Sequence, residues 1–195
     1  MPTVTALHED RRGRVVVELD GGPWRVVPAD VVVRAELAEG RELDRAALRL
    51  LRRELRRAEA LAVAARALHP RDLSEQRLAK RLERAKVAPA VRAEALETLG
   101  RAGLVDDARY ARVRAGALAG RGYGDAAIAA DLERDGVDRE LSAQAVERLP
   151  PEAERAREIV GRRGPGGRTA RYLASRGFGD DALEAALGAG FANDP

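Results

Sequence analysis

The stretch IAADLERDGVDRELSAQAV, residues 128–146, contains the pattern from which the fold can be predicted. Its main apolar residues fall 0, 4, 9, 13 and 18 positions after Ile128, a spacing typical of two short helices joined by a tight turn. Gly136 stands in the turn, where a left-handed helix cap favours glycine. Asp138 then opens the second helix as a capping residue. We therefore expect a helix, a turn and a helix here.

The same offsets recur twice, counted from Leu78 and from Thr169. Fourteen of the fifteen positions are apolar, where a composition of 45% hydrophobic residues predicts about seven. Gly177 stands at the turn of the last copy, and Lys86 takes that place in the first. The fifteen positions are Leu78, Leu82, Val87, Val91, Leu96, Ile128, Leu132, Val137, Leu141, Val146, Thr169, Leu173, Phe178, Ala182 and Leu187. The chain thus carries three copies of one helical pair.

Further helices flank these pairs. Residues 44–68 form a predicted long helix with a leucine stripe, and it leads the first copy. Residues 107–119 and 151–162 form predicted helices after the first and second copies. A three-helix unit of this size is too small to bury its own apolar face. We therefore expect mainly α structure, with three tandem three-helix, helix-turn-helix-like repeats in an elongated array.

The N-terminal region differs from the rest. Asp20-Gly21-Gly22-Pro23 is a turn signal between two β-branched runs, which predicts a β-hairpin with a third strand near Val4 and a short helix after Pro28. Trp24 is expected to pin the hairpin to its neighbour. The expected segments are residues 1–40 for the hairpin and short helix, then repeats at 41–105, 106–150 and 151–195. The last repeat is expected to be truncated, because a helix after its pair must fit into residues 189–195.

Composition excludes several classes of protein. The chain has no cysteine and two histidines, so disulfides, thiolate zinc sites and a histidine-rich metal centre are not expected. Aromatic residues are only 3%, which excludes a platform of many stacked rings. The N-terminus lacks a secretory signal pattern, and no apolar run is long enough to span a bilayer. We expect a cytoplasmic protein with no membrane association and no cofactor.

Catalysis is not expected either. The glycine-rich run at residues 164–169 lacks the lysine and spacing of a phosphate-binding loop. His8 and His69 are far apart in sequence, and neither has an apparent nucleophile partner. The sequence therefore favours a binding protein over an enzyme.

Basic residues supply the candidate binding sites. Of the 35 basic residues only Lys80 and Lys86 are lysines, and the net charge is +3. Arginine suits phosphate and carboxylate partners. The alternative is that the abundance of arginine and alanine reflects only a GC-rich genome. The candidates for contact with DNA or a partner are Arg77, Lys80, Arg81, Arg84, Arg109, Arg112, Arg121, Arg162, Arg163, Arg168 and Arg171. The alternative is a solvated face balanced by acids such as Glu75 and Glu83. Reading of an operator sequence is disfavoured, because the second helices of the pairs are apolar or acidic.

Several segments together resemble a known family. They are GLVDDARYA at 103–111, RGYG at 121–124, PRDLSEQRL at 70–78 and RYLASRGF at 171–178. In this order they resemble RecX, the bacterial regulator of the RecA recombinase, over about residues 60–190. The resemblance implies a helical modulator without catalytic activity that binds RecA filaments on single-stranded DNA along the filament groove. It implies inhibition of the RecA ATPase and of strand exchange, and hence an effect on recombinational repair and the SOS response.

The residues of the resembling segments have structural interpretations as well. Tyr110 shares a predicted helical stripe with Val113 and Ala117, and this stripe is expected to face the core. Leu104, Ile128 and Leu132 are also expected in the core, and Asp107 is expected to cap a helix. We expect a monomer. Two other functions stay open from the residues alone. One is non-sequence-specific nucleic-acid binding by a helical repeat protein without a recombinase partner, and the other is an inert helical adaptor.

Overall fold

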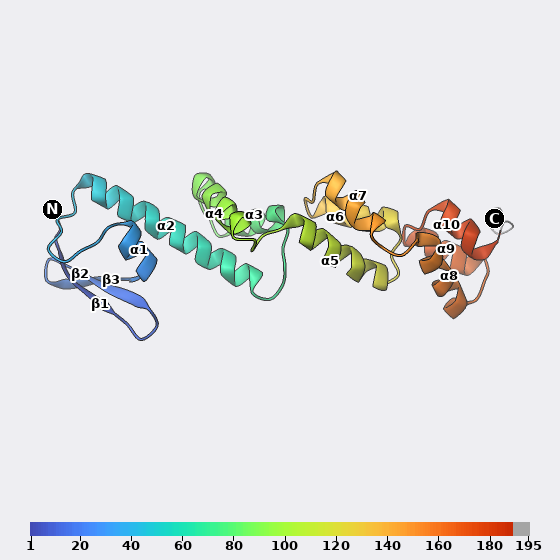
Figure 1. The fold of residues 1–195 in the computed structure, drawn as a ribbon, viewed down its shortest axis with the longest axis horizontal. Coiled ribbons are helices and arrows are strands. Elements are labelled where there is room, and N and C mark those ends of the chain that lie inside the picture. The colour runs from blue at the N-terminus through green and yellow to red at the C-terminus, as the bar shows by residue number, and fades with distance from the viewer. Residues whose placement is uncertain (189–195) are drawn as a thin grey trace. The chain divides into compact units, whose positions relative to one another are not determined.

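The structure is a computed structural model that describes residues 1–188, and it consists of two compact units. The first unit comprises Met1–Pro70 and Arg81–Thr98, and the second comprises Arg71–Lys80 and the chain from Leu99 onward. The described residues are mostly helical with one short N-terminal sheet, which confirms the predicted fold class (Figure 1). The elements are β1 (Val4–Glu9), β2 (Arg14–Leu19), β3 (Gly22–Pro28), α1 (Ala29–Arg34), α2 (Arg45–Leu68), α3 (Glu75–Arg84), α4 (Pro89–Arg101), α5 (Asp107–Gly120), α6 (Asp125–Arg134), α7 (Arg139–Glu147), α8 (Glu152–Arg163), α9 (Gly167–Ser175) and α10 (Asp180–Leu187).

The sheet is antiparallel with the order β1-β2-β3. Asp20 and Gly21 both have positive φ, 51° and 82°, which is the conformation of a two-residue hairpin turn that follows the natural twist of the strands. The predicted hairpin, third strand and short helix are therefore confirmed.

One face of the sheet forms the core of the first unit. Val17 and Val27 of the sheet, Val31 of α1 and Leu51 of α2 are all buried in a single cluster. Trp24 is 42% exposed, so the prediction that it pins the hairpin to its neighbour is wrong. The register of β3 against β2 shifts between Val17 and Glu18, so Trp24 has no partner in this pairing and lies at the irregularity.

The three predicted tight turns share one geometry. Lys86, Gly136 and Gly177 have φ of 60°, 83° and 79°, which confirms a left-handed residue at each turn. In each case the N–H of the left-handed residue donates to the carbonyl three residues earlier, and the next N–H donates to the carbonyl five before it. This pair of bonds satisfies two carbonyls at the helix end. All fifteen positions of the sequence repeat are buried or half-buried.

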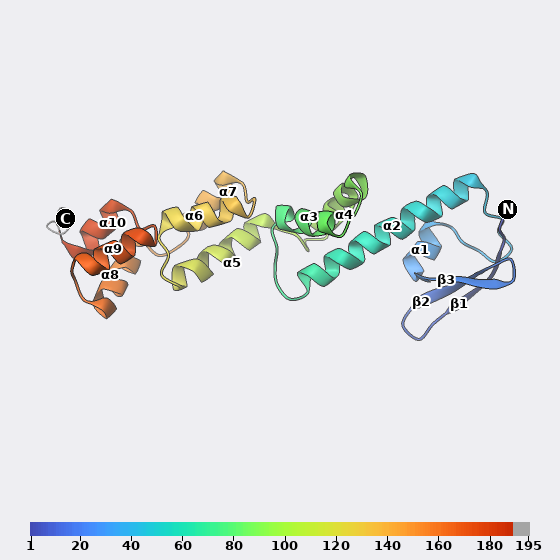
Figure 2. The ribbon, with the colours of Figure 1, turned by 180° about the vertical axis from the view of Figure 1, so that it is seen from behind.

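The second unit contains two helix triplets, α5–α7 and α8–α10, each with its own apolar cluster. The three helices of each triplet contact one another, as Figure 2 shows for α5–α7. Ile128 and Tyr110 are buried as expected. Leu104 and Val113 are 55% and 60% exposed, so their predicted burial is wrong. The buried stripe of α5 passes through Ala111, Ala115 and Leu118, and Val105 takes the core position beside Leu104.

No helix among residues 1–188 is both long and apolar enough to cross a bilayer. The helix expected within residues 189–195 lies outside the described residues. The predicted repeat boundaries stay predictions.

Candidate nucleic-acid interface

A polar joint connects the two triplets of the second unit. The carboxylate of Glu152, the first residue of α8, accepts the N–H of Asp125 at 2.6 Å and that of Gly179 at 3.1 Å. It therefore caps α6 and α10 at once. The N–H of Gly124 donates to the carbonyl of Arg176 at 2.9 Å. These bonds fix the α5–α6 turn against the end of α9.

Arg155 is the buried cation of this joint. Its guanidinium donates to the carbonyls of Pro150 and Tyr123 at 3.0 and 2.8 Å and to the carboxylate of Asp125. Burial raises the pKa of Asp125 above its usual 3.8, although the charge of Arg155 acts in the opposite direction. The cation thus links the end of the α5–α7 triplet, the α5–α6 turn and α8.

The joint brings arginines and tyrosines together into a stacked group, which we call the Arg–Tyr ladder. Its members are Arg121, Tyr123, Arg176, Tyr172 and Arg163. Arg121 lies over the ring of Tyr123 at 5.6 Å, and Arg176 lies 4.6 Å from that ring and 5.2 Å from the ring of Tyr172. Arg163 lies over Tyr172 at 4.0 Å. Guanidinium groups over aromatic faces are attracted by the ring quadrupole.

The ladder borders an open cavity of about 230 Å³, lined by Arg121, Ile159, Arg162, Arg163 and Tyr172 with two glycines. Pockets that enclose a whole drug-sized ligand are about 300 Å³ or larger. This cavity is therefore better suited to one unit of a polymer that continues past it. Arginine N–H groups fit phosphate oxygens, and a tyrosine face fits a base.

Two of the predicted binding cations have hydrogen-bond partners within the fold. Arg77 donates to the carboxylate of Asp135 at 2.9 Å and lies 3.4 Å from the hydroxyl of Tyr110. The hydrogen bond to Tyr110 and the charge of Asp135 raise the pKa of Arg77, while burial raises the pKa of Tyr110. Arg109 donates to the carbonyl of Gly103 at 2.9 Å. Both are therefore largely occupied by internal partners.

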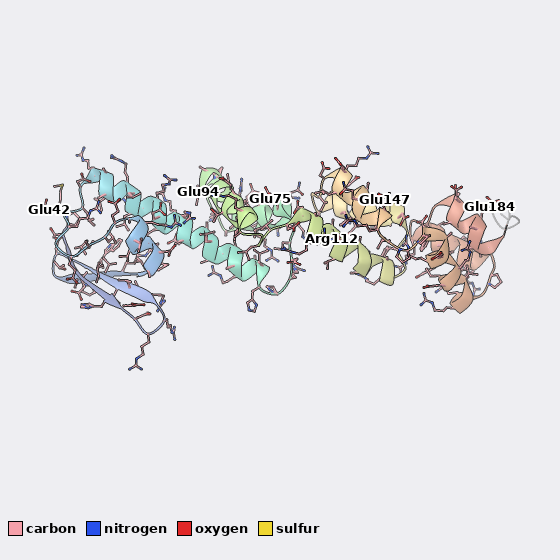
Figure 3. The ribbon with its side chains drawn as sticks, viewed as in Figure 1. Glu42, Glu75, Glu94, Arg112, Glu147 and Glu184 are labelled. Atoms are coloured by element: carbon pink, nitrogen blue, oxygen red, sulfur yellow. The ribbon has the colours of Figure 1, made fainter. Side chains whose placement is uncertain are left out.

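The other predicted cations are exposed. Lys80 donates to the side chain of Gln76 at 2.8 Å. Arg112, labelled on α5 in Figure 3, is exposed at the edge of a small cavity between α5 and α7. No ion pair or side-chain hydrogen bond within residues 1–188 involves Arg81, Arg84, Arg112, Arg162, Arg168 or Arg171. Of the predicted set, the structure places Arg121, Arg162 and Arg163 around the ladder cavity.

Three ladder residues were missed by the sequence analysis: Tyr123, Tyr172 and Arg176. A local signal exists for one contact, because Tyr172 and Arg176 lie four residues apart on one helical face. The contact between Arg176 and Tyr123 spans two triplets, and no spacing in the sequence indicates it.

The family model described as "RecX, second three-helix domain" matches residues 106–146, which correspond to α5–α7. Regulatory protein RecX of Acidithiobacillus ferrooxidans is 34% identical over 150 residues, covering 71% of this chain and 95% of the relative. This chain belongs to the RecX family. Regulatory protein RecX of Chromohalobacter salexigens is 36% identical over 124 residues, covering 59% of this chain and 82% of the relative.

Solved RecX structures share the fold. A crystal structure of regulatory protein RecX superimposes with a TM-score of 0.81 over 95% of this chain and 98% of the other, at 21% identity. RecX from Lactobacillus salivarius gives 0.61 over 68% and 94%, at 15% identity. The predicted RecX resemblance is therefore confirmed, and the ladder begins inside the matched RecX domain with Arg121 and Tyr123 and continues into α8 and α9.

Proposed function

We propose that this RecX-family regulator binds RecA filaments on single-stranded DNA along the filament groove and inhibits the RecA ATPase and strand exchange. It thereby limits recombinational repair and the SOS response. In this role the protein acts in the cytoplasm as a monomer and performs no catalysis of its own.

The Arg–Tyr ladder is the observation that supports a nucleic-acid partner. Proteins that bind single strands without sequence preference combine cations along the backbone with aromatic faces on which bases stack. The ladder supplies both within the second unit, beside an open cavity. Two rings are few, so we expect the phosphate contacts to dominate the affinity.

Inhibition follows from occupancy. A protein that lies in the filament groove excludes the incoming duplex and opposes the subunit movements that accompany ATP turnover. Three successive helical pairs supply several contacts on one chain, and linked contacts bind far more tightly than each would alone. Filament-bound protein then acts at less than one molecule per recombinase subunit.

The test is the ATPase rate of the recombinase from the same organism on single-stranded DNA, titrated with this protein. We expect inhibition by wild type and weaker inhibition by the double variant Arg121→Ala/Arg163→Ala. Arg12→Ala is the matched control, because Arg12 is an exposed arginine of the hairpin far from the ladder in sequence. Equal inhibition by wild type and the ladder variant would remove the ladder from the mechanism.

A second function uses the same ladder without a recombinase. General binding to single-stranded nucleic acid requires only the cations and rings described above. Binding to bare single strands together with an unchanged ATPase rate at excess protein would favour this function over filament regulation.

A further inference from the structure

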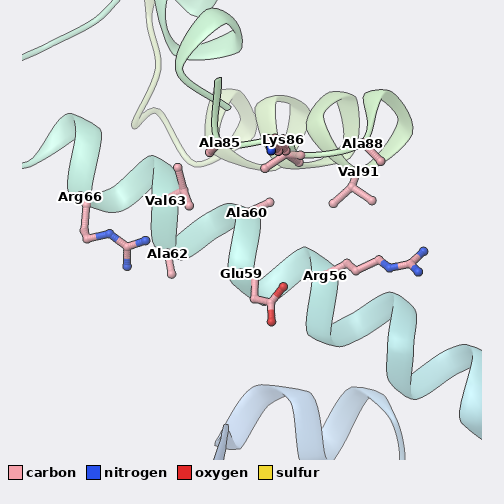
Figure 4. Close-up of a pocket in the computed structure, with 11 residues that line it drawn as sticks. Arg56, Glu59, Ala60, Ala62, Val63, Arg66, Ala85, Lys86, Ala88 and Val91 are labelled. Atoms are coloured by element: carbon pink, nitrogen blue, oxygen red, sulfur yellow. The ribbon is translucent and has the colours of Figure 1, made fainter. Parts of the chain in front are cut away.

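The first unit contains a groove between α2 and the α3–α4 turn, with a volume of about 490 Å³. Its floor is apolar and comes from Ala60 and Val63 of α2 and from Val87 and Val91 on the other side. Ala60 is buried, and the three valines are half-buried. Figure 4 shows Ala60 and Val63 facing Ala85 and Val91 across the groove.

The rim of the groove is cationic. Arg56 and Arg66 lie toward opposite ends of the groove, as Figure 4 shows, and Lys86 lies on the turn. All three are exposed, and none has an ion pair or side-chain hydrogen bond within residues 1–188. Glu59 is the one carboxylate among the lining residues, and Arg25 binds it at 2.7 Å. Three unpaired cations therefore surround an apolar floor.

The equivalent turns of the second unit are covered. An ideal Cβ on Gly136 would lie 2.4 Å from the side chain of Gln76, and one on Gly177 would lie 2.6 Å from Ala127. Each turn is thus packed against a helix from the preceding part of the chain, α3 or α6. Beside each of these turns an acid accepts a backbone N–H of the covering helix. Asp107 accepts from Glu75 of α3 at 2.8 Å, and Glu152 accepts from Asp125 of α6 at 2.6 Å.

The α3–α4 turn has a cationic side chain where the other two turns have glycine. Lys86 occupies the place of the glycine, and on the geometry of the other two turns its Cβ would clash with a helix packed there. Arg56 and Lys86 stand near this turn instead of a capping acid. A helix N-terminus carries partial positive charge, and these cations repel it. The groove is therefore unsuited to the helix that covers the other two turns, including one from a second copy of the chain.

We propose that this groove docks an acidic amphipathic segment of a partner protein, with apolar side chains on the floor and carboxylates at the rim. Helical segments bind grooves through apolar anchors at helical spacing, and complementary charge selects the partner. The groove lies wholly within the first unit and uses neither the ladder nor DNA. It is therefore a second interaction surface, separate from the proposed function.

The experiment measures fluorescence anisotropy of labelled 16-residue peptides with the full-length protein. The first probe has leucines at helical spacing and glutamates elsewhere. A second probe has lysines in place of the glutamates, and a third has serines in place of the leucines. Wild type is expected to bind the first probe most tightly, because only that probe matches both the floor and the rim.

Charge reversal at the rim provides the decisive comparison. Arg66→Glu/Lys86→Glu is expected to weaken binding of the glutamate probe about tenfold or more and to favour the lysine probe. The control Arg12→Glu changes an exposed cation of the same unit outside the groove and is expected to bind like wild type. Circular dichroism establishes that each variant is folded.

Three results would overturn the proposal: no preference of wild type for the glutamate probe, equal loss in the control, or equal binding of the serine probe. Self-association in sedimentation that disappears in Arg66→Glu/Lys86→Glu would identify a second copy as the occupant and would also overturn it. The peptide assay contains neither recombinase nor DNA, so its failure leaves the proposed function intact.

Discussion

At the scale of single residues, glycine positions illustrate what sequence can and cannot predict. The glycines at the two later turns were predictable, because helix ends that need a left-handed residue favour glycine. The second reason for glycine at these sites is the helix packed against each of them, and this is visible only in three dimensions. Lys86, which is exposed, shows that the conformation alone tolerates a side chain.

We predict that Gly177→Ala destabilises the protein by about 3 kcal/mol, from a left-handed alanine plus overpacking against the backbone of Ala127. Gly103→Ala is the matched control, since Gly103 also has positive φ, 66°, but nothing lies within 4 Å of its ideal Cβ. It is expected to cost about 1 kcal/mol. Urea unfolding measures both, and equal losses would contradict the packing argument.

Arg77 and Arg81 belong to the same predicted basic face but have different surroundings. Arg77→Ala removes the partner of Asp135 and Tyr110, and we expect a loss of about 1 kcal/mol because the side chain is partly exposed. Arg81→Ala is expected to change stability by less than about 0.5 kcal/mol. Thermal unfolding of the two variants tests this. A larger loss for Arg81→Ala would show that the exposed cation has a structural role.

At the scale of elements, helix starts were predictable to within one residue where a capping acid precedes an apolar pattern. Asp138 caps α7 as expected, with the N–H of Glu140 at 2.8 Å. Asp107 also caps a helix, but that helix is α3, because Asp106 already caps α5. Sequence alone cannot tell which helix is capped by the second of two adjacent acids, because that depends on which helix packs against it.

The α5 cap predicts a pH dependence. The backbone N–H of Arg109 donates to Asp106 at 2.8 Å, and this bond lowers the pKa of Asp106 below its usual 3.8. The stabilisation is therefore complete above pH 3.8 and is lost as pH falls through the lower, folded-state pKa. Asp106→Ala is expected to cost about 1 kcal/mol at neutral pH and less in acid.

Denaturant unfolding of Asp106→Ala at neutral pH and at about pH 2.5 measures this difference. Asp106→Asn keeps an acceptor oxygen without the titrating charge, so it is expected to cost less than Asp106→Ala at neutral pH. Its difference from wild type is expected to shrink in acid by the same amount as that of Asp106→Ala, because only the wild-type side chain titrates. A constant difference between wild type and Asp106→Ala across this range would show that the charge of the cap contributes nothing.

At the scale of the whole molecule, the repeat was predictable and the candidate site only in part. The helical pairs follow from local periodicity, which each segment carries by itself. Arg121, Arg162 and Arg163 were selected for their charge and their helical positions, while Tyr123, Tyr172 and Arg176 join them through the joint at Glu152. That joint depends on packing between triplets, for which a single sequence gives no direct signal.

The charge balance of the chain determines how DNA binding should depend on salt. The net charge is only +3 although 35 residues are basic, so long-range attraction to DNA is weak and local phosphate contacts decide the affinity. Each phosphate neutralised on a single strand contributes about −0.7 to the slope of log K against log salt. Arg121→Ala/Arg163→Ala is therefore expected to make the slope shallower by about 1.4, if each arginine neutralises one phosphate.

Titration of a labelled oligonucleotide at several salt concentrations measures this slope for wild type and the double variant, with Arg12→Ala as the control. The control is expected to keep the wild-type slope, because Arg12 lies in the turn between β1 and β2 of the first unit. An unchanged slope in the double variant would place the phosphate contacts elsewhere, with the exposed Arg168 and Arg171 as the next pair to change. Absence of any salt-dependent binding would favour the helical adaptor, since phosphate contacts cannot form without releasing counterions.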